Sequence, residues 1–415
     1  MTNATAPLLA LLLVLSVPAV TLAAADPGGS HADADPVALS SPGDGPALHP
    51  SLTEASETTN RLSLVEPVET SYASHGADLG STLAGSDSAL RADHAQFTLA
   101  DREFDEATET ERAAMLESLE ADLDDRIDDL ESRERTAVRE HAEGERSDAE
   151  LLQVLVQNYH EAIALHDVLR TLEERSDEVA DYSMSSGQQR EYSRVLEFHQ
   201  SSIQSDLAMR SAAVDSTEPF DVTIHTSQDG YRLSTIDDST YRLETTRFDN
   251  WGSDSSDYFA SINQSAADYA ADRYPWAASL TTGGEPTHQV SAGSVQDVRF
   301  DLDELYLQAY IDSGTGEIHR EHQELDVDAL PTAERESWTG DGLELAIEAT
   351  PADGPVEVTV TDADTGDPVA ATITIDGQEV GETDAEGTHL FVPPIGEYEL
   401  AAETDDGSVG ATIDL

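Results

Sequence analysis

The clearest pattern of apolar and polar positions lies between residues 104 and 215. Apolar side chains recur there at every third or fourth position amid dense charge, which places them along one side of a helix. The first run contains Leu116, Leu119, Leu123, Ile127 and Leu130, and the second contains Leu151, Leu152, Leu155, Tyr159, Ile163, His166 and Leu169. Gly144 separates the two runs, and Ser147 with Glu150 forms a capping-box signature at the start of the second.

A third run follows the break at Ser185, Ser186 and Gly187 and contains Tyr192, Val195, Leu196, His199, Ile203 and Leu207. The first run, read as one helix from Phe104 to His141, would be roughly 55 Å long. A lone helix of that length is not compact, so antiparallel packing against its neighbours is expected. The sequence therefore predicts a helical coiled-coil bundle over residues 104–215.

The period changes to two after Pro219, as in strands. Alternation is found in Asp221 to Thr226, Tyr231 to Leu233, Tyr241 to Phe248, Val295 to Leu302 and Leu305 to Ile311. Between these strands, Asp257 to Tyr274 has helical spacing, and Pro275 is expected to stop the helix. Residues 219–330 are therefore predicted to form an α+β module.

Residues 343–415 contain only strand and turn patterns. Strands are predicted at Val356 to Thr361, Ala370 to Ile375, Thr388 to Val392 and Glu397 to Ala402. Asp-Gly and Asp-Thr-Gly turns separate them, since glycine tolerates the positive φ that such turns need. This spacing predicts a β-sandwich of the immunoglobulin type.

Residues 1–56 have the pattern of an exported protein's N-terminus and no pattern that predicts a hydrophobic core. Residues 1–25 combine an apolar block from Pro7 to Val20 with small residues up to Ala25, which predicts a signal peptide cleaved after Ala25. A retained anchor is the alternative, because the block approaches the roughly 20 residues that span a bilayer. Either way, we expect the protein outside the cell or at the cell surface. Residues 26–56 lack periodicity and are predicted to be a disordered linker.

Residues 57–103 give a weaker pattern. Arg61 to Val65 is predicted to be a short strand. A weakly helical stretch follows, with Leu79, Leu83, Leu90 and Phe97 as its apolar residues.

Three resemblances rest on these segments. The order Asp362, Thr365-Gly366, Pro368-Val369, Ala371, Ile373, Asp376-Gly377, Thr383-Asp384, Gly387, Phe391 and Gly396-Glu397-Tyr398 resembles a carboxypeptidase-regulatory-like, transthyretin-like domain. That resemblance implies an Ig-like accessory module without an active site. The run from Ala309 to Ile318 is similar to the closing hairpin of PepSY-type modules, with one extra residue before Thr315-Gly316. The whole chain resembles a family of acidic haloarchaeal exported proteins of unassigned function.

Charge and missing residue types exclude several kinds of chemistry. The chain has 85 acidic and 21 basic residues, a net charge of -64, no cysteine, and no lysine in its sequence. Lysine-dependent phosphate loops, Schiff-base enzymes, thiol nucleophiles and cysteine metal sites are therefore absent. The charge opposes nucleic acid as a partner. It is typical of a protein from a halophile, where roughly 1 M salt screens charges within about 3 Å.

No catalytic, cofactor-binding or metal-binding residues are predicted. The sequence has no Gly-x-Ser-x-Gly motif. His160 and His166 lie six residues apart and do not share a helix side, and His319 and His322 are expected to be solvated on a strand. Asp362, Asp364 and Asp367 lack the order of ligands of a calcium loop and are interpreted as turn residues.

Two features remain as candidates for binding or modification. Trp251, Tyr258, Tyr274 and Trp276 belong to the densest aromatic patch, which either contacts a peptide or glycan or packs as a core helix on the sheet, the simpler interpretation. Asn263 heads an Asn-Gln-Ser glycosylation sequon, but within a predicted helix.

Together these patterns predict a multidomain α+β protein: a long helical hairpin or coiled coil, a small α+β module and a C-terminal Ig-like sandwich. We expect a non-enzymatic structural, adhesion or protein-binding role in the cell envelope, with an envelope protein or glycan as partner and membrane contact only through a retained N-terminal segment. The alternatives are an inhibitor or chaperone of a secreted peptidase, or an uncharacterised hydrolase.

Overall fold

A computed structural model describes residues 62–100, 102–213, 220–237, 239–252, 257–330, 334–351 and 353–414. The predicted signal peptide with Ala25 and the predicted linker at 26–56 lie outside these residues. Among the helices of the described residues, none is both long and apolar enough to cross a membrane.

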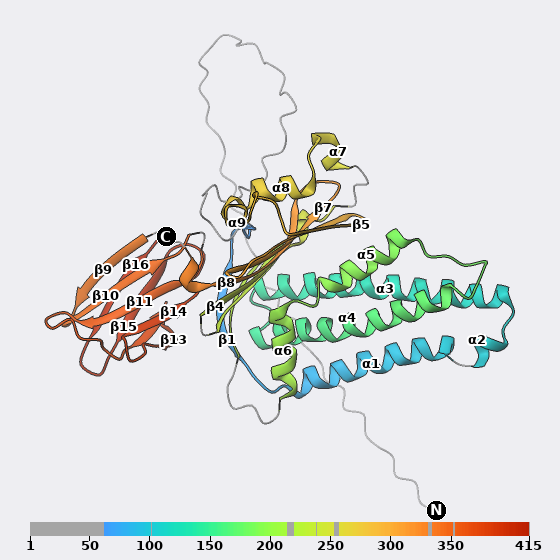
Figure 1. The fold of residues 1–415 in the computed structure, drawn as a ribbon. Helices are drawn as coiled ribbons and strands as arrows, with labels where there is room; N and C mark the ends of the chain where they lie inside the picture. Colours follow the sequence, from blue (N-terminus) through green and yellow to red (C-terminus); the bar gives the residue numbers. More distant parts are fainter. Residues whose placement is uncertain are drawn as a thin grey trace, which may run out of the picture. The chain divides into compact units, whose positions relative to one another are not determined.

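The described residues up to 213 contain six helices in chain order. They are α1 (Leu79–Ala100), α2 (Arg102–Glu106), α3 (Glu109–Ala142), α4 (Asp148–Ser176), α5 (Ser186–Glu197) and α6 (Ser202–Ala212). A short loop joins α3 to α4, and the two long helices pack as a hairpin, with α1 beside α4 (Figure 1). The predicted apolar residues Leu116, Leu123 and Leu130 are buried in the cluster between these helices.

Two predicted helices are each divided by a capping residue. The run from Phe104 to His141 is not one helix: Thr108 accepts a hydrogen bond from the Glu111 amide and ends the continuity between α2 and α3. The predicted third helix is also two helices, α5 and α6. Ser201 is the N-cap of α6, because its hydroxyl accepts a hydrogen bond from the backbone amide of Gln204 at 3.1 Å. An N-cap residue has non-helical dihedrals, so a helix must restart there.

Eight of the described strands form one antiparallel sheet in the order β1-β2-β3-β4-β8-β7-β6-β5. Their bounds are β1 (Glu69–His75), β2 (Phe220–Ser227), β3 (Gly230–Asp237), β4 (Thr240–Arg247), β5 (His288–Ala292), β6 (Val295–Asp301), β7 (Leu305–Asp312) and β8 (Ile318–Asp326). Short 3-10 turns follow β4 (Phe248–Asn250) and β8 (Val327–Ala329). The predicted strand at 61–65 is wrong, because residues 62–65 have no regular structure and β1 begins at Glu69.

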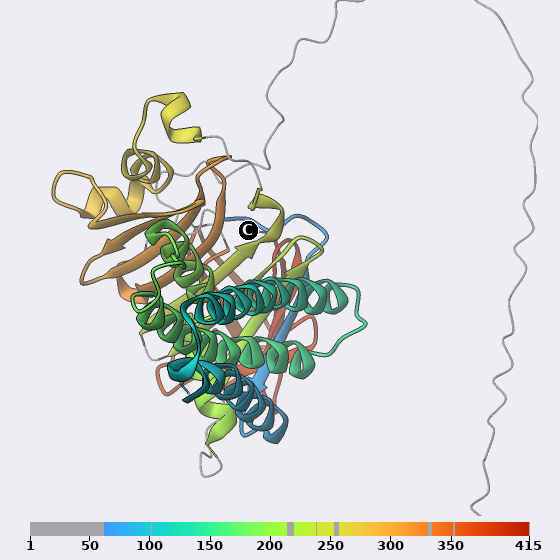
Figure 2. The ribbon, with the colours of Figure 1, turned by 90° about the vertical axis from the view of Figure 1, so that its right-hand side faces the viewer.

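Helices cover both sides of this sheet. On the side that we call the bundle side, α3, α4 and α6 pack against β2 and β3 through Val138, Leu155 and Leu207. On the opposite side lie α7 (Tyr258–Ile262), α8 (Ala266–Arg273) and α9 (Pro275–Leu280) (Figures 1 and 2). The predicted single helix at 257–274 is therefore two short ones, α7 and α8. Pro275 does not only stop a helix but also begins α9, since proline suits the first helical turn.

The C-terminal part is a sandwich of two four-stranded antiparallel sheets, in the orders β14-β11-β10-β9 and β13-β12-β15-β16. Its strands are β9 (Glu334–Gly340), β10 (Leu343–Ala349), β11 (Val356–Asp362), β12 (Thr372–Ile375), β13 (Gln378–Glu382), β14 (Thr388–Phe391), β15 (Tyr398–Glu403) and β16 (Ser408–Ile413). In β11 buried residues alternate with less buried ones, as the period-two pattern predicted, and the same alternation is found in β10, where no strand was predicted. The predicted fold class, multidomain α+β with an Ig-like sandwich, is confirmed.

Candidate functional site

The bundle side of the sheet carries a row of polar residues across four neighbouring strands. Glu244 on β4 is opposite His322 on β8, which is opposite Gln308 on β7, which is opposite Arg299 on β6. Residues directly opposite each other in an antiparallel sheet share one side. The helices α3, α4 and α6 pack on β2 and β3 through apolar side chains. The four polar residues therefore lie beside this apolar contact between helices and sheet. We call these four residues the polar row.

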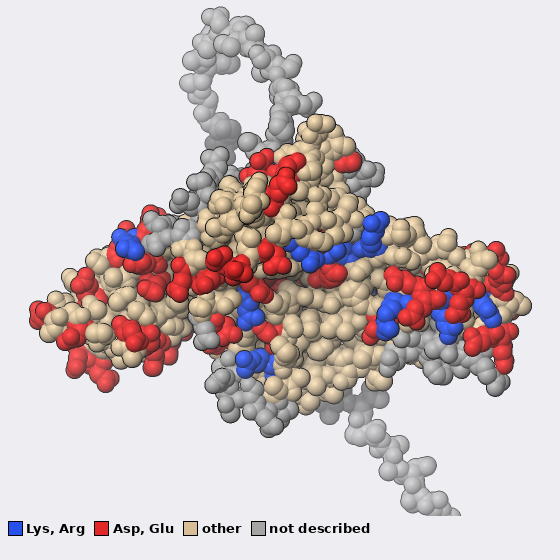
Figure 3. Space-filling model, viewed as in Figure 1, with Lys and Arg blue, Asp and Glu red and all other residues tan. Residues whose placement is uncertain are grey.

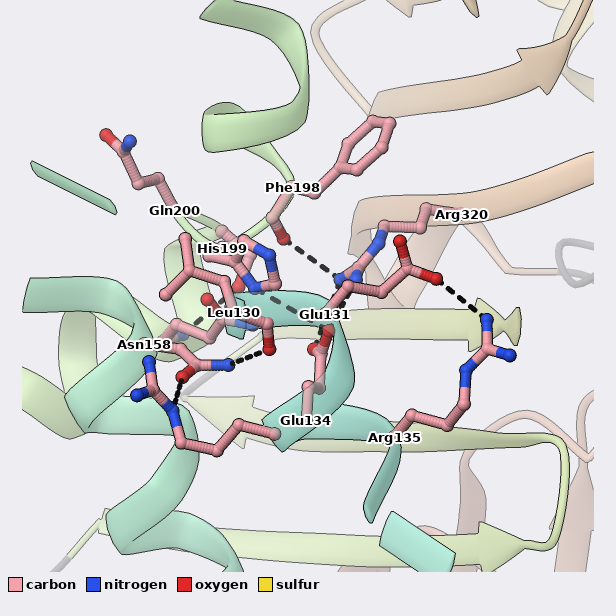
Figure 4. Close-up of polar contacts among 12 residues, drawn as sticks. Leu130, Glu131, Glu134, Arg135, Asn158, Phe198, His199, Gln200 and Arg320 are labelled. Carbon is pink, nitrogen blue, oxygen red and sulfur yellow. Dashed lines mark hydrogen bonds and ion pairs between the residues drawn. The ribbon is translucent and has the colours of Figure 1, made fainter. Parts of the chain in front are cut away.

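A fully buried ion pair lies next to the polar row, where α3 meets the sheet. Glu134 of α3 and Arg320 of β8 are 0% and 1% exposed, and a guanidinium nitrogen of Arg320 lies 2.6 Å from the Glu134 carboxylate. Arg320 also donates to the Phe198 carbonyl oxygen at 3.0 Å (Figure 4). Burial alone would raise the pKa of Glu134, but the attraction of Arg320 lowers it to about 2. Glu134 is therefore charged, and the pair fixes α3 and the loop after α5 to the sheet.

A second buried carboxylate has the opposite tendency. The Glu244 carboxylate contacts the Tyr231 hydroxyl at 2.9 Å. It accepts hydrogen bonds from the side-chain amide of Gln204 at 2.8 Å and from the Ser201 hydroxyl. Burial raises the pKa of Glu244. Tyr231 has one proton and also contacts Glu134 at 2.7 Å, so a proton on Glu244 would satisfy both tyrosine contacts. The Tyr231 hydroxyl thus contacts two carboxylates, of which Glu134 is charged and Glu244 is more readily protonated.

An open pocket of about 400 Å³ lies over the other end of the polar row. Strands β6 to β8 and the α5–α6 junction supply its lining: Glu197, Gln200, Ser201, Ser202, Arg299, Tyr306, Gln308, Tyr310, His322, Gln323 and Glu324. Asp297 lies beneath Arg299 with 0% exposure. Arg299 donates to both Asp297 oxygens at 3.1 and 2.7 Å, Gln308 donates at 3.0 Å, and Arg194 of α5 lies 2.6 Å away. These contacts hold the pocket side chains in fixed positions.

The pocket combines planar polar groups with a half-buried imidazole. The Tyr306 hydroxyl donates to Gln308 at 2.8 Å, so planar amide, guanidinium and phenol groups lie together. Burial lowers the pKa of His322 to about 3, and its Nε2 atom is buried without a hydrogen-bond partner. A neutral imidazole of that kind is far from the operating pH of a general acid or base. Among the described residues, no group of three or more His, Cys, Asp or Glu side chains is arranged to hold a metal ion.

A chain of three side chains elsewhere has the connectivity of a nucleophile-activating triad. The His141 ring lies 2.8 Å from Asp148 through Nε2 and 2.8 Å from the Thr226 hydroxyl through Nδ1. Thr226 is 0% exposed and His141 is 4% exposed, so a substrate has no access to the hydroxyl. The contacts instead connect the end of α3 and the start of α4 to β2, which is a structural role.

The four predicted aromatic residues do not meet in one groove. Tyr274 is 2% exposed, and its hydroxyl donates to Glu321 at 2.8 Å. Tyr258 and Trp276 are partly buried in the same cluster between the sheet and α7 to α9. Trp251 lies apart from them, with its ring 5.7 Å from that of Phe198. The simpler interpretation, helices packing on the sheet, describes three of the four.

The structure also shows the surroundings of the four histidines and of Asn263 that the sequence singled out. The expectation that His319 and His322 are solvated is wrong: His319 is 1% exposed and contacts the Arg247 carbonyl oxygen at 2.8 Å, and His322 is half-buried at the pocket. His160 and His166 are partly buried residues of α4. Asn263 is not inside a helix; it is exposed at the end of α7 with a left-handed φ of 53°. Its exposure satisfies the condition for a glycan acceptor.

Sequence reasoning missed Glu134, Arg320 and Asp297. A usable signal existed for Glu134, which continues the three-to-four spacing of Ile127 and Leu130 and so interrupts the apolar stripe with a charge. A charge at such a position is rarely buried without a partner. Its partner Arg320 is on a strand 186 residues further along the chain, and local spacing carries no information on such a contact.

These features define a multidomain α+β protein that combines a helical hairpin, an eight-stranded sheet and an Ig-like sandwich. The chain belongs to the family described as a domain of unknown function, DUF7096, whose model matches residues 1–216. Residues 222–331 match a family of unknown function, DUF7094, and residues 334–411 match an archaeal fibronectin-III type-like domain. No curated protein and no solved structure matches the chain.

The matches refine two of the resemblances. The sandwich is similar to an archaeal fibronectin-III type-like domain, which shares the Ig-like fold expected from the carboxypeptidase-regulatory-like resemblance. The hairpin of β7 and β8 lies within the segment matched by a family of unknown function. Its likeness to PepSY-type modules therefore stays a prediction.

Proposed function

We propose that this protein is an exported, envelope-associated binding protein of a halophile, with a structural or adhesion role and no catalytic activity. The observation that carries the proposal is the pocket over β6 to β8, whose polar lining is fixed by the buried Asp297 and its two arginines. Preorganised polar groups bind a ligand without ordering cost. A fibronectin-III type-like module on the same chain is compatible with a structural or binding role.

The lining favours a polyhydroxylated ligand such as a unit of an envelope glycan. Amide, guanidinium and carboxylate groups offer donors and acceptors at fixed angles, and the Tyr306 ring offers an apolar surface beside them. The buried charge of Asp297 under the pocket is already paired, since Arg299 and Arg194 both contact it. A neutral hydroxyl-rich ligand uses such groups without needing a free countercharge.

Export and halophily are supported by the sequence. The apolar block before Ala25 supports export, and 85 acidic against 21 basic residues support a brine environment. On the side shown in Figure 3, acidic side chains gather over the sandwich and over the outer ends of the long helices. An acidic surface of this kind stays hydrated and soluble in concentrated salt.

Binding of glycan fragments from a haloarchaeal envelope, measured by calorimetry in molar salt, tests the proposal. Arg299→Ala and Tyr306→Phe should weaken binding at least tenfold, whereas Arg335→Ala, whose side chain is 69% exposed on the sandwich, should not. A screen of glycosidase, esterase and peptidase substrates should show no turnover. Turnover that disappears with a pocket substitution would instead establish a hydrolase.

The second candidate, a regulator of a secreted peptidase, rests on the turn between β7 and β8. Asp312 holds this turn by accepting hydrogen bonds from the amides of Gly314 at 2.8 Å and Thr315 at 2.7 Å. This is the turn on which the PepSY likeness depends. Stoichiometric co-purification of a peptidase from culture supernatant, together with inhibition of its activity, would favour this candidate over the first.

A further inference from the structure

Over residues 79–92 of helix α1, the large apolar side chains lie outside and small ones lie inside. Leu79, Leu83 and Leu90 are 73%, 60% and 67% exposed, whereas Ser81 and Ser88 are 0% and 4% exposed. A surface helix normally directs its apolar stripe toward the core. Over residues 79–92 the arrangement is reversed, so these three leucines add little buried apolar area to the chain that carries them.

Close packing against α4 fixes this orientation. A Cβ atom on Gly80 would lie 2.0 Å from the amide nitrogen of Gln153, and one on Gly85 would lie 2.7 Å from the His160 ring. A side chain at position 85 would therefore displace the His160 ring, and one at position 80 would displace the end of the Gln153 side chain. The start of the helix is also held, because the Asp78 carboxylate accepts the amides of Gly80 and Ser81 at 3.0 and 2.9 Å. Rotation of α1 to bury its leucines would break these contacts.

The three leucines form one continuous row. At about 100° per residue, positions 79, 83 and 90 fall within about 40° of one another around the helix axis. Ser86 lies about 20° beyond one edge of this arc and is exposed. The row covers three turns of a 22-residue helix, a length that suits side-by-side contact with another helix.

The charge of α1 decides which occupant fits the row. The helix contains two acids, Asp87 and Asp93, and one base, Arg91, in 22 residues of a chain whose net charge is -64. Arg91 and Asp87 also neutralise each other at 2.6 Å. Two copies of such an acidic chain repel each other least where the charge is lowest. A lipid surface fits less well, because membrane-surface helices carry many basic residues beside their apolar face.

We propose that α1 is a self-association surface, on which the row of Leu79, Leu83 and Leu90 packs against the same row of a second copy about a two-fold axis. A two-fold contact uses one patch on both copies, so a low-charge, apolar row is complementary to itself. Molar salt strengthens such apolar contacts and screens the charges around them. The pairing is independent of the pocket and of its ligand.

Sedimentation or light scattering of the full chain in molar salt tests the proposal. The wild type should be a dimer at tens of micromolar. Leu83→Ser with Leu90→Ser should weaken dimerisation roughly a hundredfold or more, since each copy loses two buried leucines. Leu280→Ser is the matched control, because that leucine is 43% exposed on α9, and it should leave the dimer intact. Circular dichroism shows whether each variant is folded.

Cysteine cross-linking gives an independent measurement. The chain has no cysteine, so a single introduced one forms a disulfide only between copies. Ser86→Cys, midway along the row, should give a covalent dimer on mild oxidation, and the exposed control Ser408→Cys should not. A monomeric wild type, a dimer that survives both leucine substitutions, or a row that instead captures a different envelope protein would overturn self-pairing.

Discussion

Arginine takes several buried positions in this chain, which contains no lysine. Arg232, Arg247 and Arg320 are among its largest fully buried side chains. A guanidinium group is more weakly hydrated than an ammonium group and donates in several fixed directions, so its burial costs less when acceptors surround it. Arg320 meets that condition through Glu134 and the Phe198 carbonyl oxygen.

Removal of one partner of this ion pair should be strongly destabilising. Glu134→Ala leaves Arg320 buried without its carboxylate, and we expect a loss of about 3–5 kcal/mol in the free energy of unfolding. Chemical denaturation in molar salt measures it. Glu131→Ala, one turn earlier on α3 in a partly exposed pair with Arg135, should cost no more than about 1 kcal/mol. Replacing both Glu134 and Arg320 with apolar residues should recover most of the lost stability. Equal losses in Glu134→Ala and Glu131→Ala would contradict the assignment of Glu134 and Arg320 as a stabilising buried ion pair.

The buried histidines predict how stability depends on pH. Burial lowers the pKa of His199 to about 4 and those of His225 and His319 to about 3, against 6.5 for the exposed side chain. The unfolded chain therefore binds more protons than the folded one below about pH 6.5. Stability should fall with acidification from pH 6.5 toward pH 4, with a slope of about 1.4 kcal/mol per pH unit for each histidine.

One substitution separates a single histidine from the rest. His225 contacts the Pro393 carbonyl oxygen through Nε2 at 3.0 Å, and a glutamine amide also donates such a bond. His225→Gln should reduce the acid slope by one histidine's share while leaving the profile above pH 7 parallel to the wild type. Unfolding free energies from pH 4.5 to 8 measure this, and an unchanged slope would show that His225 does not contribute.

At the scale of elements, two turns of the same sequence type have different surroundings. Asp312 and Asp362 each accept the amide of a threonine three residues later, at 2.7 and 2.8 Å, and each threonine is followed by a glycine with positive φ. Gly316 has a φ of +76°, and a Cβ there would lie 2.3 Å from the Tyr258 ring. Gly366 has a φ of +75°, and a Cβ there would meet nothing within 4 Å.

This pair of turns separates the cost of backbone strain from the cost of a clash. Gly366→Ala should lower the stability of its module by roughly 1–2 kcal/mol, the cost of placing alanine in the left-handed region. Gly316→Ala should cost at least roughly 1 kcal/mol more, because the new methyl group displaces the Tyr258 ring. Thermal unfolding of both variants in molar salt measures the difference, and equal losses would show that Tyr258 moves away without cost.

Local spacing predicted the type of most elements but not their division. The stripe of Leu116 to Leu130 and the alternation in β11 come from helical and strand periods, which the sequence displays directly. The caps Thr108 and Ser201 were missed because the apolar spacing continues across them and conceals the restart. The strand at 61–65 was wrong because β1 pairs with β2, about 150 residues away, and that partner decides where the strand lies.

At the scale of the whole molecule, the candidate site depends on contacts between distant segments. Asp297 on β6 meets Arg194 from α5, and Arg320 on β8 meets Glu134 from α3. Neither pair has a fixed sequence spacing, so local patterns carried no signal for either contact. The exclusion of lysine and cysteine chemistry needed no structure, whereas the pocket was visible only when helices and sheet were placed together.

The response to salt also depends on the molecule as a whole, through its net charge. A net charge of -64 is tolerated while ions screen it within about 3 Å at 1 M, but the screening length grows to about 10 Å at 0.1 M. Acids on α3 are especially dense, and burial together with Asp124, Asp125 and Asp129 raises the pKa of Asp128. Dilution below about 0.5 M should therefore loosen the helices through repulsion between these carboxylates.

Circular dichroism over a dilution series measures the midpoint of this loss. Asp125→Asn with Asp129→Asn, both exposed on α3, should move the midpoint to lower salt by removing two of the repelling charges. A sugar added at equal osmolarity should protect less than salt does, because it does not screen charge. Helicity that stays constant down to low salt, in the wild type and the variant alike, would show that the acidic surface is not what ties this fold to brine.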